Sequence, residues 1–206
     1  AVWLDGTLRG PDGYRTATMD RGQRICQVAS PERRFAVRSV LFDGAFAARD
    51  AWADSVADRW VRVFTGDFAP TMRSFLARAE ALRGTITPVL EDHGVPEDFL
   101  YLAVIESGLD PNAVSRARAV GPWQFMHFTA REMGLTLTWS VDERRDPVAA
   151  TDAAARYLRS LYEDFGDWAL AAAAYNAGPW RVRSAMKVYG ESTFWGLARS
   201  GALPRE

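Results

Sequence analysis

Apolar side chains recur three and four positions apart in successive segments between residues 45 and 189. This spacing places them on one face of an α-helix, so each segment predicts an amphipathic helix. The first stripe of apolar residues consists of Ala48, Trp52, Val56, Trp60 and Val63, and the second runs from Met72 to Leu90. We expect both stripes to be buried. The pattern predicts an all-α, mostly helical globule.

Start and stop signals divide these segments. Gly94 followed by Pro96 and two acids predicts a helix start, because proline and negative charge both favour the first turn. Asp146 and Asp167 each stand where an N-cap is expected before an apolar stripe. A final helix is predicted from about Trp180 to Tyr189.

The composition limits the functions that the chain can have. Lys and Arg number 25 against 26 Asp and Glu, so no global basic field exists to attract nucleic acid. The single cysteine excludes an intrachain disulfide, and no segment has the pattern of a signal peptide or a membrane span. His93 and His127 lack the spacing of metal ligands, so we expect neither a metal site nor a cofactor.

The first part of the chain differs from the rest. Residues 1–43 contain short mixed runs separated by glycines, which predict turns and a short hairpin. We therefore expect an unassigned N-terminal extension over residues 1–57 and one helical domain over residues 58–206. A length of 206 residues suits one compact domain with a small appendage.

Glu106 is the residue whose position is hardest to explain structurally. The seven residues before it, 99–105, are almost wholly apolar and uncharged, so we expect that helix to be buried nearly all round. Desolvation would raise the pKa of a carboxyl group there, as a general acid at a glycosidic oxygen requires. The alternative is a carboxylate that is solvated or bonded to an arginine at the end of the helix.

Three blocks of sequence stand out: Ile105-Glu106-Ser107-Gly108-Leu109-Asp110-Pro111, Ala119-Val120-Gly121-Pro122-Trp123-Gln124-Phe125-Met126 and Ala173-Ala174-Tyr175-Asn176-Ala177-Gly178. Together they resemble the lytic transglycosylases with the soluble-transglycosylase (SLT) catalytic domain, whose fold is related to goose-type lysozyme. Their order and separation also fit that family. The likeness is clearest over about residues 84–195 and looks closest to the membrane-bound type D branch.

The resemblance implies a specific reaction. Such enzymes cleave the β-1,4 bond between N-acetylmuramic acid and N-acetylglucosamine in peptidoglycan, and one glutamate makes both proton transfers. Glu106 would protonate the glycosidic oxygen and then accept a proton from the muramyl 6-hydroxyl as this attacks internally. The product is a 1,6-anhydromuramyl end. An internal nucleophile has a high effective concentration, so no metal or second acid is required.

The resemblance also implies binding residues. Tyr175 and Asn176 would reach the catalytic centre, with the Tyr175 hydroxyl bonding near Glu106 or the acetamido group of the substrate. Ser115, Gln124 and Met126 would contact the sugars or their substituents. The two secondary candidates are Ser107, expected to support the helix end, and Trp123, which could stack on a sugar. By residue type alone, and not from the resemblance, Arg116 and Arg118 are candidates for contact with stem-peptide carboxylates; the alternative is that they are ordinary surface arginines.

Two alternatives remain open from the sequence. A hydrolytic muramidase on the same fold would need a second acid, for which Glu132, Asp142 and Glu143 qualify by residue type alone. The chain could also be a non-catalytic peptidoglycan-binding protein. Whether the enzyme is a lytic transglycosylase or a muramidase, we expect it to bind peptidoglycan glycan strands, with cell-envelope proteins as possible further partners. We also expect a monomer and a place in the bacterial cell envelope or outside the cell.

Overall fold

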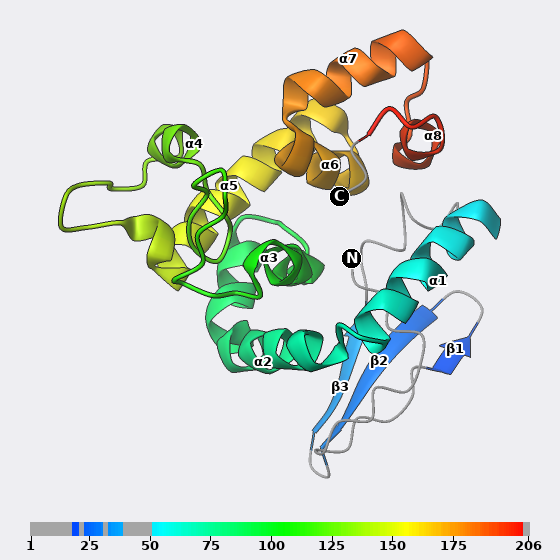
Figure 1. Cartoon of the computed structure of the whole chain (residues 1–206), viewed down its shortest axis with the longest axis horizontal. Coiled ribbons are helices and arrows are strands. Elements are labelled where there is room, and N and C mark those ends of the chain that lie inside the picture. Colours follow the sequence, from blue (N-terminus) through cyan, green and yellow to red (C-terminus); the bar gives the residue numbers. More distant parts are fainter. Residues whose placement is uncertain (1–17, 21–22, 31–32, 39–50, 204–206) are drawn as a thin grey trace.

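The computed structural model describes residues 18–20, 23–30, 33–38 and 51–203, and it describes side chains for residues 51–203 (Figure 1). A small antiparallel sheet precedes the helices, with strand order β1-β2-β3. The hairpin expected near the N-terminus is present, since β1 pairs with β2 and β2 with β3. The strands are β1 (Thr18–Asp20), β2 (Gln23–Ser30) and β3 (Arg33–Arg38).

The rest of the described chain is mostly helical, as the apolar stripes predicted, which agrees with the expected all-α fold. None of its helices combines the length and the apolar character needed to cross a membrane. The helices are α1 (Ala51–Thr65), α2 (Ala69–Asp92), η2 (Glu97–Phe99), α3 (Leu100–Ser107), α4 (His127–Glu132), η3 (Glu143–Arg145), α5 (Pro147–Phe165), α6 (Trp168–Ala177), α7 (Pro179–Tyr189) and α8 (Phe194–Arg199).

Helix α1 buries a different face from the predicted one. Its buried residues are Ala53 and Val61. Of the predicted stripe, Trp52, Trp60 and Val63 are exposed, Val56 is partly buried and Ala48 lies outside the described residues. The prediction of a buried stripe is therefore wrong for α1, because periodicity shows that a helix has an apolar face but not which face meets the core. Helix α1 also runs without a break through residue 57, so the expected boundary falls inside a helix.

Helix α3 follows the predicted start and stop signals. Pro96 is the N-cap of η2, which leads into α3, and Gly108 ends α3 in the left-handed conformation. Leu100, Ala103 and Val104 are buried, but Ile105 is 44% exposed. The expectation of burial all round is therefore wrong for the last turn, where the helix reaches the surface beside Glu106.

Helix α5 lies between two hydrophobic clusters. It contacts α2 and α6, while α6 contacts α7 and α8 (Figure 1). One cluster joins α2, α3 and most of α5, and the other joins the end of α5 to α6, α7 and α8. Tyr175 and Trp168 pack against both clusters. The caps predicted at Asp146 and Asp167 are confirmed, since both carboxylates accept backbone N–H groups of the next helix.

Candidate active site

The last turn of α3 carries Glu106 and is held by its neighbours on both sides. Glu106 is partly buried. The Ser107 hydroxyl donates to the Pro122 carbonyl over 2.7 Å, which ties the end of α3 to the loop that follows. The Gly108 carbonyl accepts a hydrogen bond from Arg78, and a Cβ at Gly108 would collide with the Phe75 ring. Ser107 therefore supports the helix end, in the role expected of it.

Residues 109–126, here called the site loop, connect α3 to α4 as a compact hairpin-like segment. Val120 makes bridges with both Val114 and Phe125. The backbone is unusual, because all the non-glycine residues with positive φ in the described part of the chain lie in this loop. They are Leu109, Arg118 and Gln124. Left-handed conformations cost energy for residues with a Cβ and tend to occur at functional sites, so this loop is the strained segment of the fold.

Three charged residues at η3, Asp142, Arg144 and Arg145, hold the site loop in place and are here called the brace on η3. Arg144 donates from Nε and Nη2 to the two carboxylate oxygens of Asp142, each over 2.8 Å, and from Nη1 to the Phe125 carbonyl over 3.4 Å. Arg145 donates to the Pro111 carbonyl over 3.2 Å. The hydrogen bonds from Arg144 are the main cause of a lowered pKa for Asp142. Arg144 and Arg145 therefore help to position the site loop.

Gly121 is the point of closest approach between the site loop and this brace. It has a φ of 82°, and a Cβ there would stand closer than 3.0 Å to the carbonyl carbon and oxygen of Arg144. Its amide donates to the Ala113 carbonyl over 3.0 Å. Glycine is required here both for the backbone conformation and for the space.

Tyr175, on the last turn of α6, brings the third sequence block to the site. Its hydroxyl donates a hydrogen bond to the Trp123 carbonyl over 2.8 Å. Burial is the largest cause of the strongly raised pKa of Tyr175, and the charges of Glu106 and then Tyr157 raise it further. Glu106 and Tyr175 are therefore close enough in space to interact electrostatically, although they belong to different blocks of the sequence.

The other predicted binding residues have different degrees of exposure. Met126 is 45% exposed, and Asn176 is exposed at the end of α6. Gln124 is partly buried, and its side-chain amide donates to the Gly121 carbonyl over 2.7 Å. The Ser115 hydroxyl oxygen accepts the Ala119 N–H over 3.0 Å. Each retains surface through which it could contact a ligand.

Trp123 does not have the role suggested for it. The side chain is 0% exposed, and its indole N–H donates to the Thr151 hydroxyl over 2.9 Å. It packs edge-on against Tyr175, with ring centroids 6.5 Å apart. A fully buried ring cannot stack on a sugar, so that prediction is wrong. Trp123 instead helps to set the position of Tyr175 through the core.

Family comparison covers the part of the chain that carries these residues. The profile of the transglycosylase SLT domain family matches residues 89–197, just over half of the chain. This chain belongs to that family. The matched segment contains the end of α3, the site loop, the brace on η3 and the last turn of α6.

Several known proteins are similar to part of this chain. Over 134 residues the chain is 41% identical to the membrane-bound lytic murein transglycosylase D of Escherichia coli K12. This match covers 63% of this chain and 29% of the relative. It is 34% identical over 122 residues to the peptidoglycan transglycosylase gp16 of Escherichia phage T7, covering 57% of this chain and 9% of the relative. The chain thus spans less than a third of the length of these relatives.

The SLT domain places the other candidate acids in structural roles or at its surface. Asp142 is held by Arg144, and a Glu143 oxygen accepts the Thr136 N–H over 2.6 Å. Glu132 is exposed on α4. His93 pairs with Asp152 over 2.8 Å, and the described residues contain no group of three or more histidines, cysteines and acids that could hold a metal ion.

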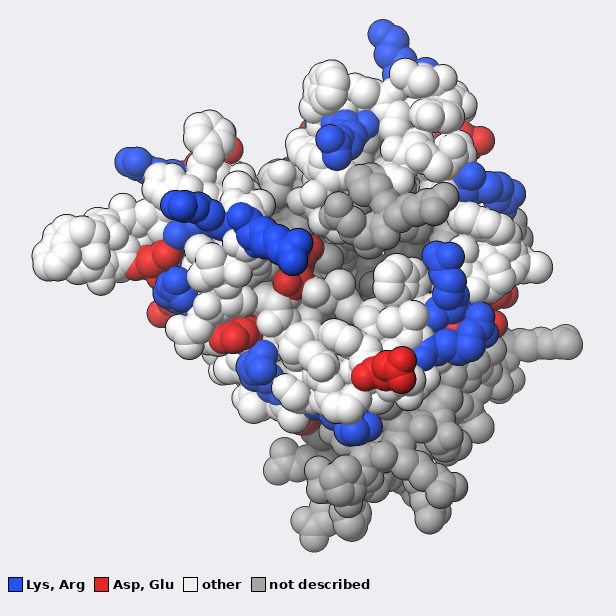
Figure 2. Space-filling model, in the orientation of Figure 1, with Lys and Arg blue, Asp and Glu red and all other residues white. Residues whose placement is uncertain are grey.

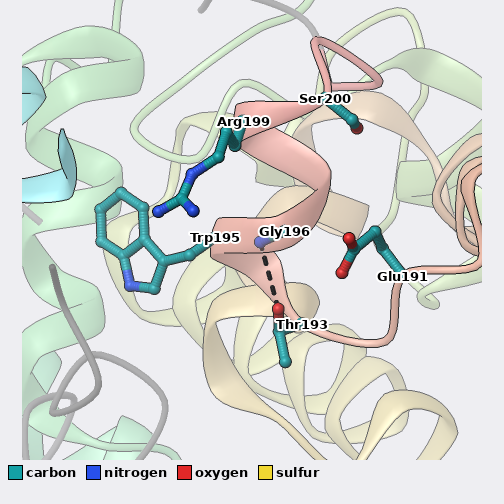
Figure 3. Close-up of a pocket in the computed structure, with 6 residues that line it drawn as sticks. All are labelled: Glu191, Thr193, Trp195, Gly196, Arg199 and Ser200. Atoms are coloured by element: carbon teal, nitrogen blue, oxygen red, sulfur yellow. Dashed lines mark hydrogen bonds between the residues drawn. The ribbon is translucent and has the colours of Figure 1, made fainter.

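The surface of the SLT domain has a hollow and a separate pocket. Figure 2 shows the hollow between the α4 side of the molecule and the α6–α7 side, with basic and acidic side chains at its edge. The pocket drawn in Figure 3, of about 400 Å³, lies at α8 and is lined by none of the predicted site residues. Its lining residues are Glu191, Thr193, Trp195, Gly196, Arg199 and Ser200.

Proposed function

We propose that this chain is the catalytic domain of a lytic transglycosylase that cleaves the glycan strands of peptidoglycan, with Glu106 as its single acid and base. The observation that carries the proposal is the electrostatic interaction between Glu106 and Tyr175 in a chain of the SLT family. The names of two relatives, a murein transglycosylase and a peptidoglycan transglycosylase, support the substrate class.

The proposed reaction needs only one carboxyl group. Glu106 donates a proton to the oxygen that joins N-acetylmuramic acid to the following N-acetylglucosamine, and that C–O bond breaks. The acetamido group of the muramyl residue stabilises the positive charge at the anomeric carbon. The muramyl 6-hydroxyl then attacks this carbon while Glu106, now a carboxylate, accepts the hydroxyl proton. The product carries a 1,6-anhydro bridge, no water is consumed, and Glu106 returns to its starting protonation state.

Tyr175 has a supporting role in this proposal. Its raised pKa keeps the hydroxyl protonated at neutral pH, so it can only act as a hydrogen-bond donor or acceptor there. The bond to the Trp123 carbonyl fixes the position of the phenol, which interacts electrostatically with Glu106. The sugars or their substituents are proposed to be contacted by four other residues: Ser115, Gln124, Met126 and Asn176.

The proposed catalytic domain begins with α1, because that helix is continuous across residue 57. We propose that it works as a monomer in the bacterial cell envelope or outside the cell, where peptidoglycan is accessible. The relative from Escherichia coli is named as membrane-bound, which agrees with an envelope location.

The test is mass spectrometry of the soluble products released from purified peptidoglycan, with the parent chain compared with Glu106→Gln. We expect 1,6-anhydromuramyl ends from the parent and none from the variant, whose amide can neither donate nor accept the catalytic proton. Reducing muramyl ends from the parent would replace the proposal with a hydrolytic muramidase. Retained binding to peptidoglycan with no product from the parent would replace it with a non-catalytic binding protein. Asp67→Asn, at an exposed carboxylate between α1 and α2, is the control and should retain the parent's products.

A further inference from the structure

The tip of the site loop carries two exposed arginines, Arg116 and Arg118. Neither guanidinium makes an ion pair, hydrogen bond or ring contact with the described part of the chain. They are the only Lys or Arg residues between α3 and α4. Since the chain as a whole has a net charge of −1, this positive charge is a local feature and not part of a general basic surface.

The backbone that presents these arginines is a tight, well-defined hairpin tip. Arg118 N donates to Ser115 O over 2.9 Å, and Ser115 N donates to Ala119 O over 2.9 Å. This is the pattern of a three-residue hairpin loop whose last residue is left-handed, a position that favours glycine. Arg118 occupies it with a φ of 66°.

An arginine in a glycine position has an energetic cost, and the Arg118 side chain makes no hydrogen bond, ion pair or ring contact with the described part of the chain to offset it. Strained residues of this kind occur preferentially where a site needs their side chains. The location agrees, because Ser115 at the base of the tip is itself a proposed substrate contact. Gln124, another proposed substrate contact, follows the tip in the same loop, after Val120, which bridges to Val114.

We propose that Arg116 and Arg118 form a carboxylate-binding rim that recognises the acidic substituents of the muramyl residues, a specificity element that rests on the proposed function. A guanidinium binds a carboxylate with two parallel hydrogen bonds, which suits a ligand that arrives from solvent. In peptidoglycan this carboxylate belongs either to the stem peptide or, where the peptide has been removed, to the free lactyl group. The chemistry is the same for both sources.

The test measures binding in a Glu106→Gln background, where no turnover occurs, with the full chain. The probes are glycan strands with stem peptides, strands freed of peptides that expose lactyl carboxylates, and chitin oligosaccharides, which lack carboxylates. We compare Arg118→Gly, the double variant Arg116→Ala with Arg118→Gly, and the control Arg73→Ala, which removes one exposed arginine from α2. Arg118→Gly suits the native turn, so it should fold at least as well as the parent.

We expect the Kd of Arg118→Gly for at least one carboxylate-bearing probe to rise roughly three- to tenfold at low salt, and that of the double variant to rise further. The probe that responds identifies the source of the carboxylate. The Kd for chitin oligosaccharides should be unchanged, added salt should reduce the difference, and Arg73→Ala should bind like the parent. An unchanged Kd for both carboxylate-bearing probes would overturn the proposal, as would an equal rise for chitin oligosaccharides.

These outcomes are independent of the proposed reaction. If the Glu106 parent formed no anhydromuramyl ends while the binding differences were present, the transglycosylase assignment would fail and the rim would stand. If the parent formed these ends and the binding differences were absent, the rim would fail and the transglycosylase would stand.

Discussion

Gly121 and Arg144 approach so closely that a Cβ at residue 121 would stand under 3.0 Å from the Arg144 carbonyl oxygen. This contact joins the site loop to the brace on η3. Arg144 makes a second connection to the same loop, because its side chain donates to the Phe125 carbonyl. The position of the site loop therefore depends on a backbone contact with a residue outside the loop.

Gly121→Ala should destabilise the protein by roughly 3–5 kcal/mol, because a left-handed backbone and a collision with a carbonyl group act together. The free energy of unfolding in urea measures the effect. Gly134→Ala is the matched control: Gly134 has the same φ of 82°, but a Cβ there would meet nothing within 4 Å. It should cost only about 1 kcal/mol. Equal losses for the two variants would show that the contact with Arg144 is unimportant.

Thr151→Val should destabilise the core by about 1–3 kcal/mol, because it leaves the buried Trp123 N–H without its acceptor. Thermal or urea unfolding gives the value. Thr87→Val is the control, since the Thr87 hydroxyl bonds only to the Arg83 carbonyl of its own helix. We expect that change to lie within about 0.5 kcal/mol of the parent. A neutral Thr151→Val would mean that Trp123 does not depend on this hydrogen bond.

Tyr175→Phe should reduce the rate of product formation by roughly tenfold, since the ring loses the hydrogen bond to the Trp123 carbonyl that fixes its position. The rate of anhydromuramyl release measures this. Tyr189→Phe, at an exposed tyrosine at the end of α7, should be as active as the parent. Full activity of Tyr175→Phe would show that the Tyr175 hydroxyl has no role in the proposed reaction.

The same variant should change the dependence of stability on pH. The pKa of Tyr175 is raised by burial first and then by Glu106 and Tyr157, so the folded state retains the phenolic proton more strongly than the unfolded state does. This stabilisation is complete below the ordinary value of 10.0 and declines as pH rises above it. Unfolding measured from pH 9 to 11 should therefore show a steeper loss for the parent than for Tyr175→Phe. Parallel curves would contradict this.

Asp142→Asn should weaken the brace on η3. Arg144 lowers the pKa of Asp142 below its ordinary 3.8, so the carboxylate stabilises the fold above that pH and loses this effect as pH falls through the lowered value. At pH 7 we expect a loss of at most about 1 kcal/mol, because Asp142 is partly exposed to solvent. The difference from the parent should disappear in acid. A difference that persists well below pH 3.8 would require another cause.

The sequence by itself determined the longer helices, the N-caps at Asp146 and Asp167, and the residues that mark the family. Apolar spacing predicted α2, and Asp146 and Asp167 predicted two helix starts, because these features depend on residues within one or two turns. The short helices α4 and α8 were not predicted, since six residues carry little periodicity.

Only the tertiary structure decided which groups meet. It buried Trp123, exposed one face of α1, paired the Tyr175 hydroxyl with the Trp123 carbonyl and set Arg144 against Gly121. Each of these outcomes depends on residues that are distant in the chain and adjacent in space. Local patterns carry no information on such contacts, because the packing of whole helices determines which side chains meet and how far each is removed from water.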